Sequence, residues 1–436
     1  MIIVFLLDML LLIALLILGL PIVFCFSAAI FFVNIFVHVN MIGLFVSAFS
    51  KITDPMLLTI PLFILSGGLM SESGISDALL DFVDLFIGRI KGALGVVVTV
   101  TCGIMGAISG SGMSGVAAVG PILMPRMLKE GYTRGYSAAL ISCSSLLGLL
   151  IPPSVLTIVY GWVTGTSILA CFLATIGPGL TIMLLFSIIN LISVRKMPLT
   201  VQQQPLINFK ERWKKILICT CKALPAILVP IIVLGGIYGG IFTPSEAAAV
   251  AVIVSLVIGF FVYRVLKMKN FYGVVKESAT GTGSIMIQSF VALMLAQILV
   301  MNKVPQEIIT FLFGLTEHRY LILFIVNMYL FLQGMIVGDV TGTILIAPLL
   351  FPLIKELGIS PVHFGAILAT NLAMGGVTPP FSPTLYLGLR VCKAEFTEVL
   401  KPTLKLVIFG YIPVVFITTY WPALSLFLPR LLGYAP

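Results

Sequence analysis

One pattern of glycines and prolines occurs twice in this chain at a constant spacing of 227 residues, and it restricts the fold more than any other feature. The repeated positions are Pro121, Pro125, Gly131, Gly148, Pro152, Pro153 and Gly161 in the first copy and Pro348, Pro352, Gly358, Gly375, Pro379, Pro380 and Gly388 in the second. Each copy includes two consecutive prolines within an apolar stretch. Because proline removes a backbone donor and its ring clashes with the preceding turn, a helix cannot continue through either stretch. The pattern therefore predicts two equivalent broken helices.

The composition indicates the environment in which these helices lie. The chain is 60% hydrophobic and 9% charged, whereas soluble domains carry about 25% charged residues. Its mean hydropathy is +1.19. The long apolar runs are Ile2–Phe26, Pro55–Met70, Gly95–Ala107, Ile168–Ser193, Ala223–Gly240, Ala247–Tyr263, Ser284–Met301, Leu321–Val337 and Leu406–Leu426. Because about 20 apolar residues span a bilayer, we predict an all-α polytopic protein embedded in the lipid bilayer, with about 10–12 transmembrane segments.

The first apolar run is interpreted as a retained membrane helix. Ile2–Phe26 has no Lys or Arg before it or within it, and the first basic residue is Lys51. A cleaved signal peptide has a basic start and a shorter apolar core. We therefore expect Ile2–Phe26 to remain in the protein as a membrane helix.

Basic residues gather in two places and predict both the domain division and the orientation. The first cluster consists of Arg195, Lys196, Lys210, Arg212, Lys214, Lys215 and Lys222, and the second of Arg264, Lys267, Lys269 and Lys276. Two apolar runs separate the clusters, so both can face one side, and the positive-inside rule makes that side the cytoplasm. We predict a first half (1–193), a basic cytoplasmic linker (194–222) and a second half (223–436). An anionic-lipid or nucleic-acid patch is the alternative, but topology explains the charges and no nucleic-acid partner is expected.

Each copy of the pattern also contains a stretch of small residues upstream of the proline pair, at Ile108–Gly115 and Val337–Thr343. We interpret these stretches as the tips of two re-entrant hairpins. Backbone carbonyls freed in lipid cost several kcal/mol each, so breaks persist only beside protein, water or an ion. Such carbonyls, with Ser and Thr hydroxyls, suit a small cation such as sodium, and half-helix N-termini attract an anion. Paired interruptions of this kind are typical of the binding site of a secondary transporter.

Two carboxylates in apolar surroundings have alternative interpretations. Asp339 follows the run Leu321–Val337 and is a candidate cation ligand, because an ionisable residue within the membrane is usually functional. It can also serve as the N-cap of a helix that starts at Val340, and the two roles are compatible. Glu246 lies two residues after Pro244, which is typical of an ordinary helix start.

Other functional classes fit the sequence less well. The segment Gly112–Gly115 matches the GxSG pattern of a rhomboid protease, but the histidine that such an enzyme needs in a late membrane helix is missing. An intramembrane aspartyl protease needs the motif Gly-x-Gly-Asp, but Ile336 stands in place of the first glycine before Asp339. Such a protease also needs a second aspartate within the membrane, and Asp8 is the only other aspartate in an apolar run. The sequence lacks a Walker-type ATP motif. We therefore expect that the chain is not an enzyme and has no catalytic residues. A channel is also disfavoured, because a channel needs a continuous polar pore and the sequence predicts two closed hairpin tips.

The motifs together resemble one known family, and the resemblance extends over nearly the whole chain. They are Gly19–Pro21 (GLP), Ile60–Gly67 (IPLFILSG), Ile108–Ser111 (ISGS), Ile151–Ser154 (IPPS), Gly239–Ala248 (GGIFTPSEAA), Gly358–Gly365 (GISPVHFG) and Thr378–Pro380 (TPP). The chain is similar to the large membrane subunit, or permease, of tripartite ATP-independent periplasmic (TRAP) transporters, which belong to the ion transporter superfamily. The resemblance implies an elevator-type transporter with a stator and a mobile transport domain built from two inverted repeats.

The resemblance also implies partners and a location. A soluble periplasmic binding protein would deliver the substrate, a small four-helix membrane subunit would complete the complex, and the complex would lie in the bacterial inner (cytoplasmic) membrane. The substrates of the family are mostly organic anions, either carboxylates or sugar acids, and their import is coupled to sodium. The alternative is an ion-coupled anion carrier of the same superfamily that works without a binding protein.

The family's sodium sites, carried over to this sequence, give two groups of candidate ligands. Ser109, Ser111, Gly148 and Asp339 would surround one sodium ion, and Thr343, Gly376 and Thr378 another. No other metal and no other cofactor is expected. The anionic substrate would dock between the hairpin tips and the breaks, and its candidate ligands are Ser111, Ser114, Pro153, Ser154, Pro380, Ser382 and Thr384.

The chain departs from the usual family pattern within these regions. The departures are Gly115 for an acid, Val340 for a proline, Leu149 for a proline, Ser382 for a glycine and Thr384 for an asparagine. Most of the substituted residues are small or carry an oxygen, which is compatible with a cation site.

Overall fold

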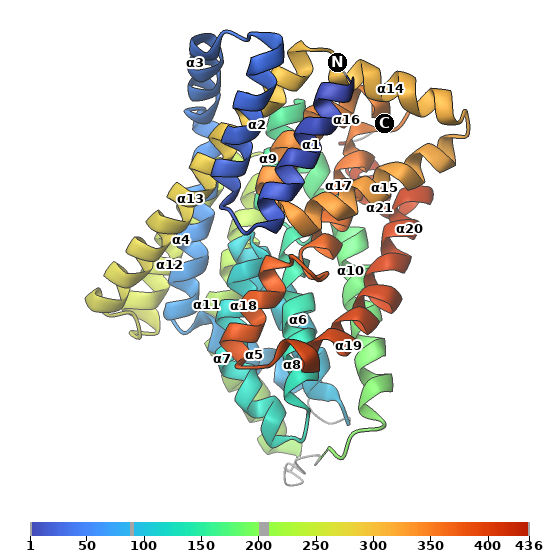
Figure 1. Cartoon of the computed structure of the whole chain (residues 1–436). Helices are drawn as coiled ribbons and strands as arrows, with labels where there is room; N and C mark the ends of the chain where they lie inside the picture. Colours follow the sequence, from blue (N-terminus) through green and yellow to red (C-terminus); the bar gives the residue numbers. More distant parts are fainter. Residues whose placement is uncertain (1, 88–90, 200–208, 435–436) are drawn as a thin grey trace.

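The computed structural model describes residues 2–87, 91–199 and 209–434, and every secondary-structure element in these ranges is helical (Figure 1). Six of the described segments are long and apolar enough to cross a membrane: Pro55–Glu72, Ile168–Val194, Pro244–Val262, Met268–Met301, Arg319–Ile336 and Phe396–Tyr420. Large apolar side chains such as Leu18, Ile42 and Phe261 are exposed, as expected of a surface that faces lipid. The chain is therefore an all-α polytopic membrane protein, as predicted.

The first apolar run forms two helices, which corrects the prediction of one. Helix α1 (Ile2–Ile17) ends before Gly19, whose φ is +79°, and α2 (Ile22–Val37) starts after Pro21. Glycine adopts this left-handed conformation without steric cost, and proline, which lacks an N–H, suits the start of a helix. The Gly-Leu-Pro step therefore turns the chain although all its neighbours are apolar.

The first copy of the pattern folds into a hairpin followed by a broken helix, as predicted. The hairpin consists of α6 (Ala93–Ser109) and α7 (Gly112–Lys129). The broken helix consists of α8 (Arg134–Ser145), the 3-10 turn η2 (Leu146–Leu149) and α9 (Val155–Thr164), and Pro152 and Pro153 lie at its break. A long helix, α10 (Ile168–Val194), follows.

The second copy repeats this order of elements. Helices α15 (Arg319–Ile336) and α16 (Val340–Glu356) form the hairpin, and α17 (Pro361–Gly375) and α18 (Pro383–Cys392) form the broken helix. Helix α19 (Phe396–Leu406), the π-helical turn η4 (Val407–Tyr411) and α20 (Ile412–Tyr420) correspond to α10. In Figure 1 the hairpin α6–α7 reaches the lower end of the molecule and the hairpin α15–α16 the upper end. The two hairpins thus lie at opposite ends of the molecule (Figure 1), as expected of inverted repeats.

Three of the remaining helices, α4, α12 and α13, lie together on one side of the repeats, and we call them the arm (Figure 1). The arm helices are α4 (Thr59–Glu72), α12 (Pro244–Val257) and α13 (Met268–Met301), and they extend to the left in Figure 1. Helix α4 packs against both other arm helices. The other supporting elements are α3 (Met41–Ile52), η1 (Pro55–Leu58), α5 (Ile75–Ile87), α11 (Phe209–Tyr238), η3 (Ile258–Val262), α14 (Val304–Leu315) and α21 (Ala423–Leu431).

The start of α12 confirms the ordinary role expected of Glu246. The Thr243 hydroxyl accepts a hydrogen bond from the Glu246 amide at 3.3 Å, and the Glu246 carboxylate accepts one from the Thr243 amide at 2.8 Å. This reciprocal capping box, with Pro244 at the first position, satisfies the donors at the helix start.

The predicted linker (194–222) starts at Val194, the last residue of α10, and extends into α11, whose first residue is Phe209. Residues 209–222 of that linker form the first turns of α11, and residues 200–208 lie outside the described residues. The division into two halves and a linker stays a prediction.

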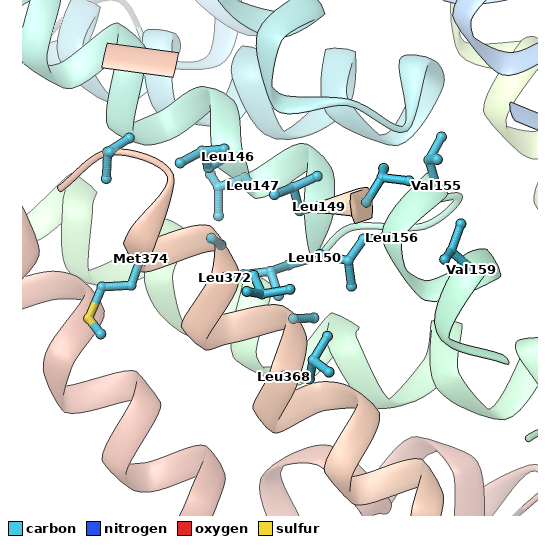
Figure 2. Packing of buried hydrophobic residues seen from close by; sticks show 14 of the residues in the cluster. Leu146, Leu147, Leu149, Leu150, Val155, Leu156, Val159, Leu368, Leu372 and Met374 are labelled. Atoms are coloured by element: carbon cyan, nitrogen blue, oxygen red, sulfur yellow. The ribbon is translucent and has the colours of Figure 1, made fainter. Parts of the chain in front are cut away.

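Part of the apolar core lies where the two broken helices meet. Figure 2 shows leucines of the first break facing side chains of α17. The buried side chains there include Leu146, Leu147, Leu149, Leu150, Leu368 and Leu372. Leu146 reaches the second break, because a Cβ atom added at Gly376 would lie 3.3 Å from its Cδ1. The core thus fixes the two breaks relative to each other.

Candidate functional site

The tip of the first hairpin brings together three of the predicted site residues. Helix α6 ends at Ser109, Gly110 turns the chain with a φ of +65°, and Ser111 is the N-cap of α7. The Ser114 hydroxyl lies 2.6 Å from the Ser109 Oγ and 2.9 Å from the Ser111 carbonyl oxygen. The Ser109 hydroxyl donates to the Met105 carbonyl at 3.0 Å. The tip is therefore a compact cluster of hydroxyl and carbonyl oxygens.

The first break packs directly on this tip. A Cβ atom added at Gly148 would lie 2.6 Å from the Gly106 Cα and 3.2 Å from the Ser111 carbonyl oxygen, so only glycine fits there. The Gly110 carbonyl accepts a hydrogen bond from the Val155 amide at 3.2 Å, which ties the tip to the start of α9. The predicted residues Gly148, Pro153 and Ser154 thus lie beside the first tip.

The tip of the second hairpin brings Asp339 and Thr343 together. Asp339 is the N-cap of α16, as the structural alternative predicted, and its Oδ1 accepts a hydrogen bond from the Val340 amide at 2.8 Å. The Asp339 carbonyl accepts from the Thr343 hydroxyl at 2.7 Å. The contacts described for Asp339 thus lie within its own hairpin, and its grouping with Ser109, Ser111 and Gly148 around one ion stays a prediction.

The second break contains an unsatisfied hydroxyl. Ser382, the N-cap of α18, is fully buried, and its Oγ has no hydrogen-bond partner among the described residues. Thr384 is buried two residues further on, while the Thr378 hydroxyl donates to the Met374 carbonyl at 2.7 Å and Gly376 is the C-cap of α17. A buried hydroxyl without a partner is costly, so Ser382 is suited to bind a ligand.

The two breaks differ in exposure. Pro152 and Pro153 are buried, whereas Pro380 is exposed and its carbonyl accepts a hydrogen bond from the half-exposed Tyr386 hydroxyl at 2.8 Å. A ligand could therefore reach the second break from outside more easily than the first.

Helix N-termini from different repeats lie side by side in two pairs. Helix α7 packs on α18, and α9 packs on α16, so each repeat contributes one member to each pair. In the first pair a Cβ atom added at Gly120 would lie 2.7 Å from the Val391 Cγ1. This contact lies nine residues after Ser111 on α7 and nine residues after Ser382 on α18, which agrees with two helices that start together at these serines. In this crosswise pairing, each of the four helices that start at the tips and breaks packs against a helix of the other repeat.

Most of these helix starts lack a side-chain cap. Ser111, Ser154 and Ser382 occupy N-cap positions but form no capping hydrogen bond, and the Ser154 hydroxyl instead donates to the Leu149 carbonyl at 2.8 Å. The first-turn N–H groups of such helices carry partial positive charge and attract anions. The tips and breaks (106–115, 146–155, 336–343 and 376–384) contain one ionisable side chain, Asp339, which would instead attract a cation.

Two supporting residues that sequence reasoning did not single out reach the hairpin tips. Gly67 of α4 lies against Ser109, and the Gln288 side chain of α13 accepts a hydrogen bond from the Thr341 hydroxyl at 3.2 Å. The available signals were the position of Gly67 at the end of the motif Ile60–Gly67 and the polar Gln288 within the apolar run Ser284–Met301.

Comparisons with known proteins agree with this architecture. Residues 9–424 match the sequence model of the family described as "Tripartite ATP-independent periplasmic transporter, DctM component". A C4-dicarboxylate TRAP transporter large permease protein of Pseudomonas aeruginosa is 35% identical over 86% of this chain and 87% of the relative. An isethionate TRAP transporter permease protein of Oleidesulfovibrio alaskensis is 34% identical over 87% of this chain, which spans 59% of that longer relative.

A solved structure supports the fold. The crystal structure of the YdaH transporter of Alcanivorax borkumensis, described as having an unusual topology, superposes with a TM-score of 0.59 and 14% sequence identity. The match covers 89% of this chain and 90% of that one. At this identity the similarity concerns the fold alone.

Proposed function

The chain belongs to the DctM component family of tripartite ATP-independent periplasmic transporters, and on this premise we propose that it imports a small organic anion by sodium-coupled secondary transport. As a transporter subunit it is not an enzyme. The relative named for C4-dicarboxylates supports a carboxylate as the class of substrate, and the relative named for isethionate, a sulfonate, supports a small organic anion in general. The membrane would be the bacterial inner membrane.

The observation that carries the proposal is the crosswise pairing of uncapped helix starts. In the α7–α18 pair, Ser111 and Ser382 are N-caps without capping bonds, and the Ser382 Oγ is buried without a partner. We place the carboxylate of the substrate here, where first-turn N–H groups and serine hydroxyls would replace its water shell. Ser114 and Thr384 would line the same place.

Sodium would bind where oxygens and the one carboxylate gather. Asp339 supplies negative charge beside the Thr343 hydroxyl at the second tip, and the first tip offers the oxygens of Ser109 and Ser111. Neutral oxygens with at most one carboxylate suit a monovalent cation that exchanges readily. Binding of sodium at the tips would order them before the anion docks.

Transport would proceed by an elevator movement. Helices of the two repeats pack on each other in the pairs α7–α18, α9–α16, α8–α19 and α10–α17, which favours movement as a unit, and the arm is the candidate stator. An ion-free Asp339 would be costly to carry past the apolar barrier, so movement without sodium is disfavoured.

A periplasmic binding protein and a small four-helix membrane subunit would complete the transporter, in line with the tripartite family. The alternative is a carrier that works without a binding protein. Uptake by vesicles that contain the membrane subunits, measured with and without the binding protein, separates the two: the proposal requires that uptake depends on it.

The experiment that tests sodium coupling is a thermal unfolding series of the purified chain in sodium, potassium and choline chloride at equal ionic strength. A ligand that binds only the folded state stabilises it by mass action, by about 2.7 kcal/mol at a hundredfold excess over Kd. A higher Tm in sodium alone is expected. Equal Tm values in the three salts would contradict the proposed sodium sites.

A further inference from the structure

Two adjacent glycines in α4 face different partners. A Cβ atom added at Gly67 would lie 2.6 Å from the Cβ and 3.0 Å from the Cα of Ser109, at the tip of the first hairpin. A Cβ atom added at Gly68 would meet the Val274 Cγ1 at 2.9 Å and the Ser278 Oγ at 3.4 Å, both on α13. Gly67 therefore faces the first repeat, whereas Gly68 faces α13 of the arm.

The first tip cannot retreat from Gly67 without disturbing its other contacts. Behind it, a Cβ atom added at Gly106 would lie 2.1 Å from the Gly148 Cα, so α6 is held between α4 and the first break. Ser109 is also linked through its hydroxyl to Ser114. Because packed interiors have little free volume, a side chain at position 67 must displace the serine cluster of the tip.

The second tip rests on α13, the arm helix that Gly68 of α4 contacts. The Thr341 hydroxyl donates to the Gln288 Oε1 at 3.2 Å, and the Gln288 Nε2 donates to the Ser284 Oγ at 3.3 Å. Helix α13, which carries Gln288, packs on α4 as well as on α16. One joined surface of the arm thus contacts both tips, at Gly67 and at Gln288.

We propose that Gly67 and Gln288 form a seat on the arm that holds the two hairpin tips in their ion-binding geometry. This inference rests on the proposed function, since it assigns the seat a role in sodium binding. Gly67 is a positioning residue: its missing side chain lets the backbone of the first tip close against α4. Gln288 positions the second tip through Thr341, two residues after Asp339.

The test compares Gly67→Ala with Gly68→Ala in the purified full-length chain. The first readout is the sodium concentration that gives half of the maximal Tm increase. Gly67→Ala is expected to raise this sodium concentration about tenfold, because the displaced serine cluster loses its preorganised ion-binding geometry. Gly68→Ala is expected to leave this sodium concentration within about twofold of wild type, because Val274 and Ser278 lie on α13 and belong to neither hairpin tip. Equal midpoints in the two variants would overturn the inference.

A second readout does not depend on sodium. Each alanine variant is combined with Ser111→Cys, and the rate of thiol labelling is measured in choline chloride on the peptide that carries residue 111. Gly67→Ala is expected to raise the rate about threefold or more by loosening the tip, and Gly68→Ala is not. Equal labelling rates would overturn the seat. If sodium does not raise the Tm of the wild-type chain, the proposed function is contradicted. The labelling rates would still show whether Gly67 holds the first tip in place.

The second tip has its own matched pair of variants. Gln288→Leu removes the acceptor of the Thr341 hydroxyl, and it is expected to raise the sodium midpoint about fivefold through loss of one hydrogen bond. Gln297→Leu changes the same kind of residue on the same helix, but the Gln297 Oε1 has no hydrogen-bond partner among the described residues. It is expected to leave the midpoint unchanged. An unchanged midpoint in Gln288→Leu would remove Gln288 from the seat.

Discussion

At the scale of single residues, the site is built from backbone and hydroxyl oxygens with one charge. Asp339 combines two roles that the sequence left as alternatives: it is the N-cap of α16, and it is the sole carboxylate at the tips and breaks. Several buried hydroxyls have no partner among the described residues, and Ser382 is the one of them that lies at the tips and breaks. The charge of Asp339 thus favours binding of a cation, and the unsatisfied hydroxyl of Ser382 favours binding of an anion.

Asp339→Asn tests the charge without removing the cap. Asparagine is as good an N-cap as aspartate, so Tm in choline chloride is expected to stay within a few degrees of wild type. The sodium concentration for half-maximal stabilisation is expected to rise about tenfold or more, which corresponds to about 1.4 kcal/mol. Glu246→Gln, which changes the carboxylate at the start of α12, is the control. An unchanged sodium midpoint in Asp339→Asn would remove Asp339 from the ion site.

Ser382→Ala tests the unsatisfied hydroxyl. Because the Oγ has no partner to lose, the free energy of unfolding is expected to stay the same or to rise by up to about 1 kcal/mol. The KM for transport of the organic anion is expected to rise about tenfold, because a hydrogen bond to a charged ligand is worth about 1.5–3 kcal/mol. Ser255→Ala, which removes a buried hydroxyl bonded to Ala251 in the arm, should leave KM unchanged. If Ser382→Ala behaves like this control, the hydroxyl does not contact the substrate.

At the scale of elements, each hairpin is fastened to the broken helix of its own repeat through a pair of glycines. Gly148 lies against Gly106 in the first repeat, and a Cβ atom added at Gly375 would lie 2.5 Å from the carbonyl carbon of Gly334 in the second. Gly148 and Gly375 are equivalent positions of the sequence pattern. The same close approach therefore supports both tips, and it explains why the pattern needs glycine there.

Alanine at Gly148 or Gly375 is expected to lower the free energy of unfolding in choline chloride by about 1–3 kcal/mol, the usual cost of overpacking. Gly235→Ala in α11 is the control, since nothing lies within 4 Å of its added Cβ. That change is expected to stabilise the chain by up to about 1 kcal/mol through helix propensity. Thermal unfolding of the three variants measures the difference, and equal effects at all three positions would show that the glycine contacts are not tight.

At the scale of the whole molecule, the two repeats interlock. Besides the α7–α18 and α9–α16 pairs, α8 packs on α19 and α10 packs on α17. Each half of the chain thus buries its site-forming helices against the other half, and neither half encloses the site alone.

Expression of residues 1–199 by themselves is therefore expected to give no stable protein, because the helices of the first repeat lose their partners. Co-expression with residues 209–436 is expected to restore a particle that elutes as one peak in detergent, since helices that insert separately can associate afterwards. Fluorescence-detected size-exclusion chromatography of both samples measures this. A monodisperse first half on its own would show that the repeats do not depend on each other.

Much of this fold is encoded locally and could be predicted. Helices break at Pro152–Pro153 and Pro379–Pro380 because proline cannot continue a helix, and small residues turn the chain at Gly110 and Gly338. The error at Ile2–Phe26 has a local cause as well, because hydropathy does not register the turn that Gly19 and Pro21 impose.

An all-helical membrane protein with two equivalent hairpins and breaks can be predicted from the chain, because composition, periodicity and proline geometry act over a few residues. Which helix starts lie side by side depends on long-range packing, because the pairing of α7 with α18 joins residues more than 250 positions apart. The contacts of Gly67 and Gln288 with the tips have the same origin. They arise from packing between distant helices, so the sequence marks Gly67 and Gln288 as a motif glycine and a polar residue in an apolar run but does not show what they contact.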